Sequence, residues 1–318
     1  MATGRPRQTA ESSYTDKAFV GTPSGQGAHN WQPMAFSPQT GLAYIPAQEV
    51  PMVYEAENPF VAREGGWNLG INLAANKLPD GPAELKAIRA SLKGHLAAWD
   101  PVTQKEVWRV QQGGPWNGGV LTSAGGLVFQ GTSSGQVVAY AADTGRKLWS
   151  FDAGIGIMAP PITYAVNGRQ YVAVMAGYGG GYGISTAVAD MAGPRPMGRL
   201  FVFALDAKAP YKFERIAPAP AVVVAGNWSP AVVAHGGQIF ESTCAVCHGA
   251  TARSSGVVPD LRRSSVTADK DAWHEVVING ALTSNGMISF KRWLTPADSE
   301  AVRAYIAVRA KVLKEQGT

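Results

Sequence analysis

An internal repeat limits the fold of this chain more than any other feature of the sequence. The segment from Ala98 to Trp108 recurs 41 residues later, from Ala139 to Trp149. Each copy reads as a strand, a tight turn and a returning strand that ends in Trp. The large flat rings of Trp108 and Trp149 are expected to pack between neighbouring sheets. A repeat period near 40 residues is typical of the four-stranded blades of a β-propeller.

The flanking sequence extends this β pattern. The chain has 318 residues, including 37 Gly and 21 Pro, and short apolar segments separated by turn residues run from about residue 30 to residue 206. Segments 36–46 and 199–206 predict further strands, which brings the total to about three to four blades. Because propeller rings contain about four to eight blades, we expect a mainly β region that forms part of a ring.

The composition changes after the last predicted strand. Residues 207–228 are rich in Ala and Pro, as interdomain linkers are. Apolar residues then repeat at helical spacing, with Ser229 and Thr295 placed to cap helices. The sequence therefore predicts three parts: a partial propeller over residues 1–206, a linker over 207–228 and a small all-α domain over 229–318.

The two cysteines of the chain lie in one motif, Cys-x-x-Cys-His, formed by Cys244, Cys247 and His248. One short helical turn with this spacing presents two thiols to the vinyl groups of a haem and one imidazole to its iron. A zinc site would want two more thiol or imidazole ligands, and a redox dithiol would not need the histidine. We therefore predict a covalently attached c-type haem in the helical domain.

The second ligand of the haem iron must come from outside this motif. Met287 lies 39 residues after His248, in a loop between two predicted helices, and a thioether paired with His raises the reduction potential of the haem. The alternative role for Met287 is to fill the core. His274 is the rival ligand, but it stands within a predicted helix. Pro259 is expected to shape the loop across from His248.

Charge and hydropathy exclude two classes of partner. The formal net charge is +5, and the basic residues are scattered, so we expect no binding to nucleic acid. No run reaches the ~18 to 20 apolar residues of a membrane span, and residues 1–7 lack the apolar segment of a secretory signal. Because covalent haem is attached outside the cytoplasm, we still expect a periplasmic protein.

Further motifs give the chain a resemblance to a known family. The segments Gly27 to Met34, Pro115 to Gly119 and Gly177 to Gly183, together with the Trp repeat and the haem motif, resemble the C-terminal part of the quinohaemoprotein alcohol dehydrogenases. The resemblance covers nearly the whole chain. It implies part of an eight-bladed propeller that holds pyrroloquinoline quinone (PQQ), followed by a cytochrome c domain.

The resemblance also assigns residues to the quinone. It implies that Asn30 and Trp31 lie beside PQQ and that Gly181 brings a backbone amide to it, with Asn117 as a third candidate. An Asn amide can hydrogen-bond to quinone and carboxylate oxygens, and glycine permits close backbone approach. Without the resemblance, Asn30 would be read as a turn residue and Gly181 as a loop glycine. The alternative role for Asn117 is to shape its own turn.

Other residues of the family have no counterpart in this sequence. The catalytic aspartate base, the calcium-binding carboxylate and amide, the quinone-pairing lysine or arginine and the vicinal disulfide belong to a half that would precede Met1. Calcium is therefore implied by the resemblance alone. Asp100, Asp143 and Asp152 are expected to be turn residues rather than substitutes for the base. We predict no catalytic base in this chain.

Two functions of different classes follow. In the first, the chain is the C-terminal part of a PQQ-dependent alcohol dehydrogenase, which oxidises alcohols to aldehydes and passes electrons through the haem to a soluble cytochrome, a copper protein or a quinone. It would then be either a fragmentary gene product or one half of a split enzyme, whose partner is the missing N-terminal half of the propeller. In the second, residues 229–318 act as a stand-alone electron-transfer cytochrome. A third hypothesis makes the haem vestigial and the β region a partner-binding surface.

Overall fold

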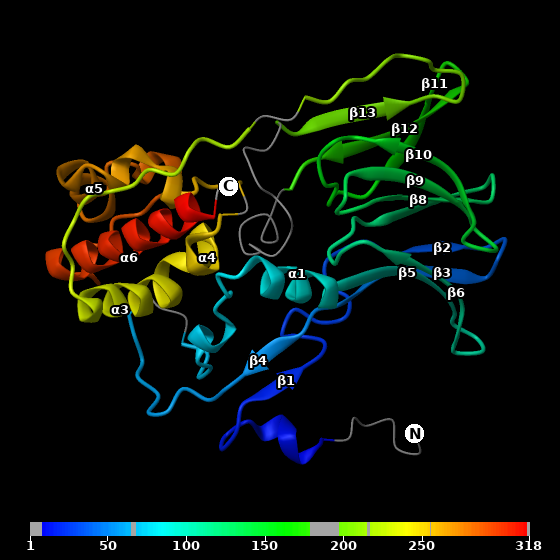
Figure 1. Ribbon diagram of the computed structural model, residues 1–318. Coiled ribbons are helices and arrows are strands. Elements are labelled where there is room, and N and C mark those ends of the chain that lie inside the picture. Colours follow the sequence, from blue (N-terminus) through cyan, green and yellow to red (C-terminus); the bar gives the residue numbers. More distant parts are fainter. Residues whose placement is uncertain (1–7, 65–67, 179–196, 215–216, 255, 317–318) are drawn as a thin grey trace.

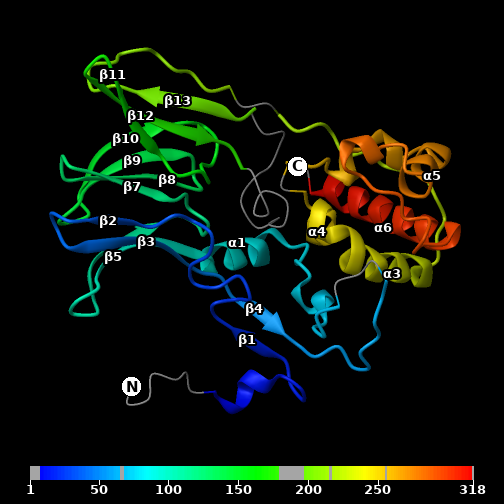
Figure 2. The same cartoon turned by 180° about the vertical axis from the view of Figure 1, so that it is seen from behind.

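Stacked β-sheets form one side of the molecule and a group of helices forms the other, with α1 between them (Figure 1). Seen from behind, β1 and β4 lie below this junction (Figure 2). The computed structural model describes residues 8–64, 68–178, 197–214, 217–254 and 256–316. Gly181 therefore lies outside the described residues.

The described elements have the following bounds. The strands are β1 (Phe19–Gly21), β2 (Ala35–Ser37), β3 (Leu42–Glu49), β4 (Met52–Tyr54), β5 (Lys93–Asp100), β6 (Lys105–Gln112), β7 (Val120–Ser123), β8 (Leu127–Gly131), β9 (Gln136–Ala141), β10 (Lys147–Asp152), β11 (Ile162–Val166), β12 (Arg169–Ala176) and β13 (Arg199–Phe203). The helices are α1 (Pro82–Ser91), α3 (Pro230–Ile239), α4 (Ala245–His248), α5 (Lys270–Val277) and α6 (Pro296–Glu315). Short helical turns are η1 (Ala10–Ser13), η2 (Leu73–Asn76), η3 (Phe240–Cys244), η4 (Ala250–Ala252), η5 (Leu261–Arg263), η6 (Ser265–Thr267) and η7 (Thr283–Asn285).

The first two large sheets share one apolar core. β2, β3, β5 and β6 form an antiparallel sheet in that order, and β7 to β10 form a second. Tyr44 of β3 and Leu96 and Ala98 of β5 are shielded from water and join Val128 and Tyr140 of the second sheet. Full burial of a large apolar side chain contributes about 1.5–3 kcal/mol, so this contact holds the two sheets face to face.

The repeat in the sequence marks equivalent places in these sheets. Its two copies are the β5–β6 and β9–β10 hairpins, the third and fourth strands of each sheet. β11, β12 and β13 add a three-stranded antiparallel sheet. The expected architecture, part of a propeller followed by a small helical domain, is thus confirmed, with three blade-like sheets among the described residues.

The repeated tryptophans pack between sheets, as the sequence predicts. The Trp108 indole Nε1 donates to the carbonyl oxygen of Ala142, 3.1 Å away in the following sheet. A Cβ on Gly145, whose φ is +68°, would lie 2.6 Å from the Trp108 ring, so both the backbone conformation and the ring require glycine there. The ring of Trp149 lies edge-on to Phe203 of β13, with centroids 5.1 Å apart.

The three aspartates in blade turns make local contacts. Asp100 accepts a bond from the backbone amide of Val102 at 2.8 Å, and hydrogen bonds, chiefly from the Thr103 hydroxyl, lower its pKa. Asp152 accepts from the amide two residues onward at 2.8 Å, and Asp143 accepts from the neighbouring Thr144 hydroxyl at 3.2 Å. These are the contacts of turn residues, and the lowered pKa of Asp100 makes that carboxylate a weak base.

The helices of the C-terminal region begin where the sequence predicts. Ser229 accepts a bond from the amide of Val232 at the start of α3. Thr295 and Asp298 form a reciprocal capping box at the start of α6. Such caps stabilise a helix by about 0.5–2 kcal/mol each, and they direct α3 and α6 against each other around a core that includes Phe240.

The stretch between β13 and α3 is held at both ends. The Tyr211 ring lies 5.0 Å from Phe201 of β13, measured between centroids. At the other end, the Trp228 indole donates to the Glu300 carboxylate on α6 at 2.9 Å. The role of this stretch as a linker, and the division at residues 206 and 228, stay predictions.

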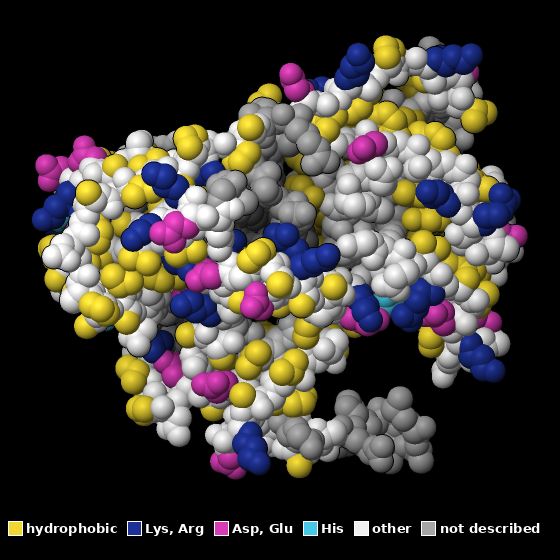
Figure 3. Space-filling view, in the orientation of Figure 1, with side chains coloured by type: hydrophobic (Ala, Val, Ile, Leu, Met, Phe, Trp, Pro, Cys, Tyr) yellow, Lys and Arg dark blue, Asp and Glu magenta, His cyan; other side chains and the backbone are white. Residues whose placement is uncertain are grey.

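Surface charge and helix hydropathy can be described for the part of the chain that the structure covers. On the face displayed in Figure 3, basic and acidic side chains are interspersed. Among the described residues, no helix is both long enough and apolar enough to span a membrane.

Candidate functional site

The two cysteines lie on consecutive short helices of the C-terminal region. Cys244 ends η3 and caps α4, which contains Cys247 and His248 and stops at Gly249, where φ is +78°. Both thiols are unbonded, and Cys247 is exposed. Burial raises the pKa of the Cys244 thiol to about 12. A buried thiol with a raised pKa is a poor redox nucleophile, because that role requires the thiolate.

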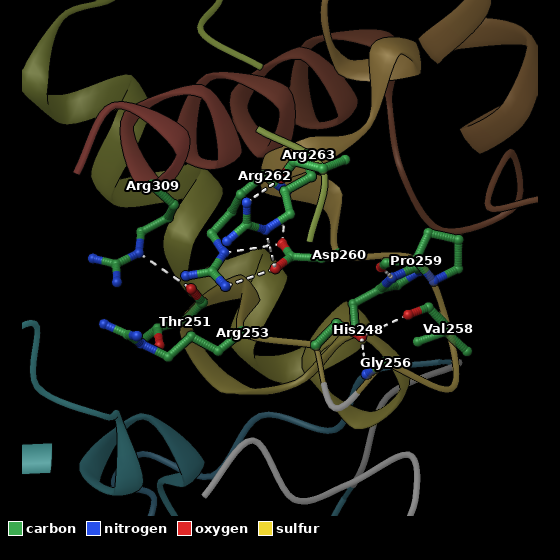
Figure 4. Close-up of polar contacts among 12 residues, drawn as sticks. His248, Thr251, Arg253, Gly256, Val258, Pro259, Asp260, Arg262, Arg263 and Arg309 are labelled. Carbon is green, nitrogen blue, oxygen red and sulfur yellow. Dashed lines mark hydrogen bonds and ion pairs between the residues drawn. The ribbon is translucent and has the colours of Figure 1, made fainter. Parts of the chain in front are cut away.

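The imidazole of His248 is held in one orientation and one tautomer. Its ring is buried, with 8% of the residue exposed, and Nδ1 lies 3.2 Å from the carbonyl oxygen of Pro259. Since a carbonyl can only accept, Nδ1 carries the proton and Nε2 keeps its lone pair. Burial also lowers the pKa of His248, which favours the neutral imidazole that a metal needs. Figure 4 shows His248 beside the Pro259 loop.

The loop that carries Pro259 is held by an ion pair that sequence reasoning did not identify. The Arg262 guanidinium donates to both carboxylate oxygens of Asp260, at 2.9 and 2.7 Å. The Arg262 side chain is only 8% exposed, so the pair is shielded from water. By fixing the residue after Pro259, it fixes the carbonyl that orients His248. Nothing in the spacing Asp-Leu-Arg distinguishes this pair from a surface one.

A second set of contacts supports the segment behind the cysteines. The carboxylate Oε1 of Glu241 accepts from the Thr251 amide and from the Tyr305 hydroxyl, each at 2.9 Å. Burial raises the pKa of Glu241 and that of Tyr305. These bonds tie η3 to η4 and to α6, so the turn carrying Cys244 and His248 is braced from behind.

Met287 occupies a loop that follows η7. Gly286, with φ at +91°, turns the chain, and the half-buried Met287 packs against the same apolar cluster as Cys244 and Ala245. His274, the rival ligand, lies on α5 and is partly buried, as Met287 is. The identity of the second ligand stays a prediction.

The residues present fit a covalently attached haem. Two unbonded thiols stand three residues apart, a neutral imidazole presents Nε2, and a thioether lies in the same apolar cluster. Among the described residues, no group of three or more His, Cys, Asp or Glu side chains is arranged to hold a metal ion.

Replacing Met287 by Ala is expected to abolish the weak near-infrared sulfur-to-iron band of the ferric holoprotein while the haem stays attached. The thioether is lost but both cysteines remain. Absorbance spectra measure the effect, and Met175→Ala, at a residue 58% exposed on β12, is the matched control. A band that survives in the Met287 variant would contradict the assignment.

The residues assigned to the quinone by resemblance lie in the loop before β2 and the turn before β7. The Trp31 residue is 48% exposed, and its ring centroid lies 6.5 Å from that of Trp116. Asn30 is exposed, and its amide nitrogen donates to the carbonyl of Gln26 at 2.8 Å. Trp31 and Asn30 are therefore accessible to a ligand.

Asn117, unlike Asn30 and Trp31, is buried and bonded to the backbone of its own turn. Only 3% of the residue is exposed. Its amide nitrogen donates to the Gly114 carbonyl at 2.8 Å, and its oxygen accepts from the Ser133 amide at 2.9 Å. Both ends of the side chain bind backbone groups, which is the turn-shaping role that the sequence left open. A contact between Asn117 and the quinone stays a prediction.

Comparisons with known proteins agree with this geometry. Residues 86–172 match the family described as "Glucose/ethanol/alcohol dehydrogenase, beta-propeller domain". Residues 231–306 match "Cytochrome C oxidase, cbb3-type, subunit III". A quinohemoprotein alcohol dehydrogenase of Pseudomonas putida, ADH IIB, is 42% identical over 97% of this chain. This chain is homologous to part of the quinohaemoprotein alcohol dehydrogenases.

Other members of the family give the same result. The dehydrogenase subunit of a quinone-dependent alcohol dehydrogenase from Acetobacter aceti is 40% identical over 97% of the chain. The solved structure of ADHIIG from Pseudomonas putida HK5 superposes with a TM-score of 0.87 and 36% identity over the whole chain. This chain covers 42% of the Acetobacter subunit, 44% of ADH IIB and 47% of the ADHIIG structure, so it spans less than half the length of these relatives.

Proposed function

We propose that this chain is the C-terminal part of a periplasmic, PQQ-dependent alcohol dehydrogenase and that it carries the haem through which electrons leave the enzyme. The observation that carries the proposal is the His248–Pro259 bond behind a Cys-x-x-Cys-His turn, in a chain that also contains blades homologous to the quinone-binding propeller. A stand-alone cytochrome is not favoured, because the homology runs through the blades as well as the helical region.

Four residues of the helical region would hold the haem. Cys244 and Cys247 would form thioethers to the haem, and the Nε2 of His248 and the thioether of Met287 would be the ligands of its iron. Hydrogen bonds to Pro259 and Glu241 hold the turn that carries Cys244 and His248. When bound, PQQ accepts two electrons from an alcohol, and haem transfers electrons one at a time.

The quinone side of the chain has a positioning role in this proposal. The exposed ring of Trp31 offers a flat apolar face to a planar ligand, and the neighbouring Asn30 offers an amide for its oxygens. The aspartate that takes the hydroxyl proton of the alcohol, and the ligands of calcium, would correspond to the part of its relatives that this chain does not cover. The final acceptor would be a soluble cytochrome, a copper protein or a quinone.

Ethanol is expected to leave the haem of this chain oxidised, even after PQQ and calcium are added, because the sequence predicts no catalytic base in this chain. Absorbance at the haem bands under anaerobic conditions measures the reduction. Dithionite serves as the positive control, since it reduces haem without catalysis. Clear reduction by ethanol would overturn the view that the chemistry needs residues from outside this chain.

A further inference from the structure

Three contacts from the C-terminal helices converge on one residue of the β region. Asp80 immediately precedes the cap of α1, in the excursion between β3 and β5. The Arg309 guanidinium of α6 bonds to its carboxylate, and the Gln316 amide nitrogen donates to its carbonyl oxygen at 2.7 Å. Arg253 approaches the same carboxylate at 3.8 Å. These partners lie far from Asp80 in the sequence, so the contacts join the two parts of the molecule.

At this junction one partly exposed carboxylate faces two buried guanidinium groups. The side chains of Arg309 and Arg253 are only 5% and 15% exposed, whereas that of Asp80 is 49% exposed. The Nε and Nη2 atoms of Arg253 are buried and have no hydrogen-bond partner among the described residues. The carboxylate of Asp80 thus faces two largely buried guanidinium groups. Without it, these two cations would stand near each other with no shared counter-ion.

The junction is connected to the haem-attachment turn. The Nε of Arg309 donates to the carbonyl oxygen of Thr251 at 3.2 Å, and Thr251 follows His248 by three residues. The amide of Thr251 in turn donates to Glu241, the residue that braces η3. Figure 4 shows Arg309 and Arg253 extending on the same side of Thr251, away from the Pro259 loop.

A second ion pair joins the two parts but differs in its surroundings. Arg292 pairs with Glu64, and the two side chains are 71% and 64% exposed. Exposed pairs contribute about 0–1 kcal/mol, so this pair serves as a comparison for the shielded one.

We propose that Asp80 is a positioning residue that holds the haem-bearing helices at a fixed distance and orientation relative to the blades. The haem domain is then docked rather than loosely tethered. The consequence for electron transfer, a static path from the blades to the haem, rests on the proposed function. The docking itself does not.

The test compares holoprotein variants by the fluorescence of the blade tryptophans. Five of the described tryptophans lie in the β region, namely Trp31, Trp99, Trp108, Trp116 and Trp149. A nearby haem quenches tryptophan emission, so undocking would restore it. Asp80→Asn is expected to shift the docking equilibrium toward the undocked state by roughly tenfold to a hundredfold. Glu64→Gln, the matched control, is expected to change it by less than about fivefold.

A double variant separates positioning from general damage. Adding Arg253→Met to Asp80→Asn removes one of the two uncompensated cations, so it is expected to recover part of the quenching. Circular dichroism and the haem absorption spectrum check that each variant folds and retains haem. Small-angle scattering should show a larger radius for Asp80→Asn than for the wild type.

Tryptophan emission and radius together test whether Asp80 docks the helical region. Increased emission and radius in Asp80→Asn, with recovery in the double variant, support the proposal. Unchanged quenching in a folded, haem-bearing Asp80→Asn variant would overturn it, as would equal effects of Asp80→Asn and Glu64→Gln. None of these measurements involves an alcohol, so failure of the docking proposal is distinct from failure of the proposed dehydrogenase function.

Discussion

Replacing Cys244 and Cys247 together by Ser is expected to remove all haem from the denatured chain. The thioether bonds are what would keep haem attached once the fold is lost, and these are the two cysteines of the sequence. Denaturing electrophoresis with a peroxidase-based haem stain measures the loss. The mass of the unfolded chain, which should fall by that of one haem, checks it independently.

The matched comparison for this variant is Met287→Ala. It alters the proposed second iron ligand but no attachment point, so its chain should stain as strongly as the wild type. A stained band from the double cysteine variant would contradict the covalent haem. Equal loss of stain in both variants would indicate that folding, rather than attachment, had failed.

Gly236→Ala is expected to destabilise the helical region, although Ala is the better helix former. In an open helix this change would stabilise by about 0.8–1.0 kcal/mol. Here a Cβ on Gly236 would lie 1.8 Å from the carbonyl oxygen of Ala301, where α3 crosses α6. Overpacking of this kind costs about 1–3 kcal/mol or more, because backbone rather than a mobile side chain must move. We expect a net loss of about 2 kcal/mol in the free energy of unfolding.

The adjacent glycine provides the control. A Cβ on Gly237 would meet the Tyr305 ring at 3.1 Å, and a ring can shift by a few tenths of an ångström. Urea unfolding of the two variants, followed by circular dichroism, should therefore place Gly236→Ala well below Gly237→Ala in stability. Equal stabilities would show that α3 and α6 do not cross as closely as described.

Local patterns in the sequence account for much of this structure. The spacing between Trp108 and Trp149 predicts successive blades because each ring fills the same place against the next sheet. The caps at Ser229 and Thr295 predict helix starts because a side-chain oxygen meets backbone amides only a few residues away. The haem motif is equally local, with all three groups on one turn.

The contacts that position the site were not predictable in this way. Asp80 and Arg309 are separated by 229 residues, and no periodicity links a carboxylate in a loop to an arginine on the last helix. The bond from Thr251 to Glu241 depends on where η3 and η4 meet. Asn117 shows the converse difficulty, because the same amide suits a quinone or a turn. In the fold its hydrogen bonds go to the backbone of Gly114 and Ser133, a pattern that its sequence context does not reveal.

The most direct test of the account is reduction of the haem by alcohol in an assembled enzyme. The chain would be produced together with the part of Pseudomonas putida ADH IIB that it does not cover, loaded with PQQ and calcium, and mixed anaerobically with ethanol. We predict that the haem absorption changes to the reduced form within the turnover time, and that no change occurs without the added part. An assembly that oxidises ethanol with an artificial acceptor while its haem stays oxidised, yet reducible by dithionite, would contradict the role of this haem as the electron exit.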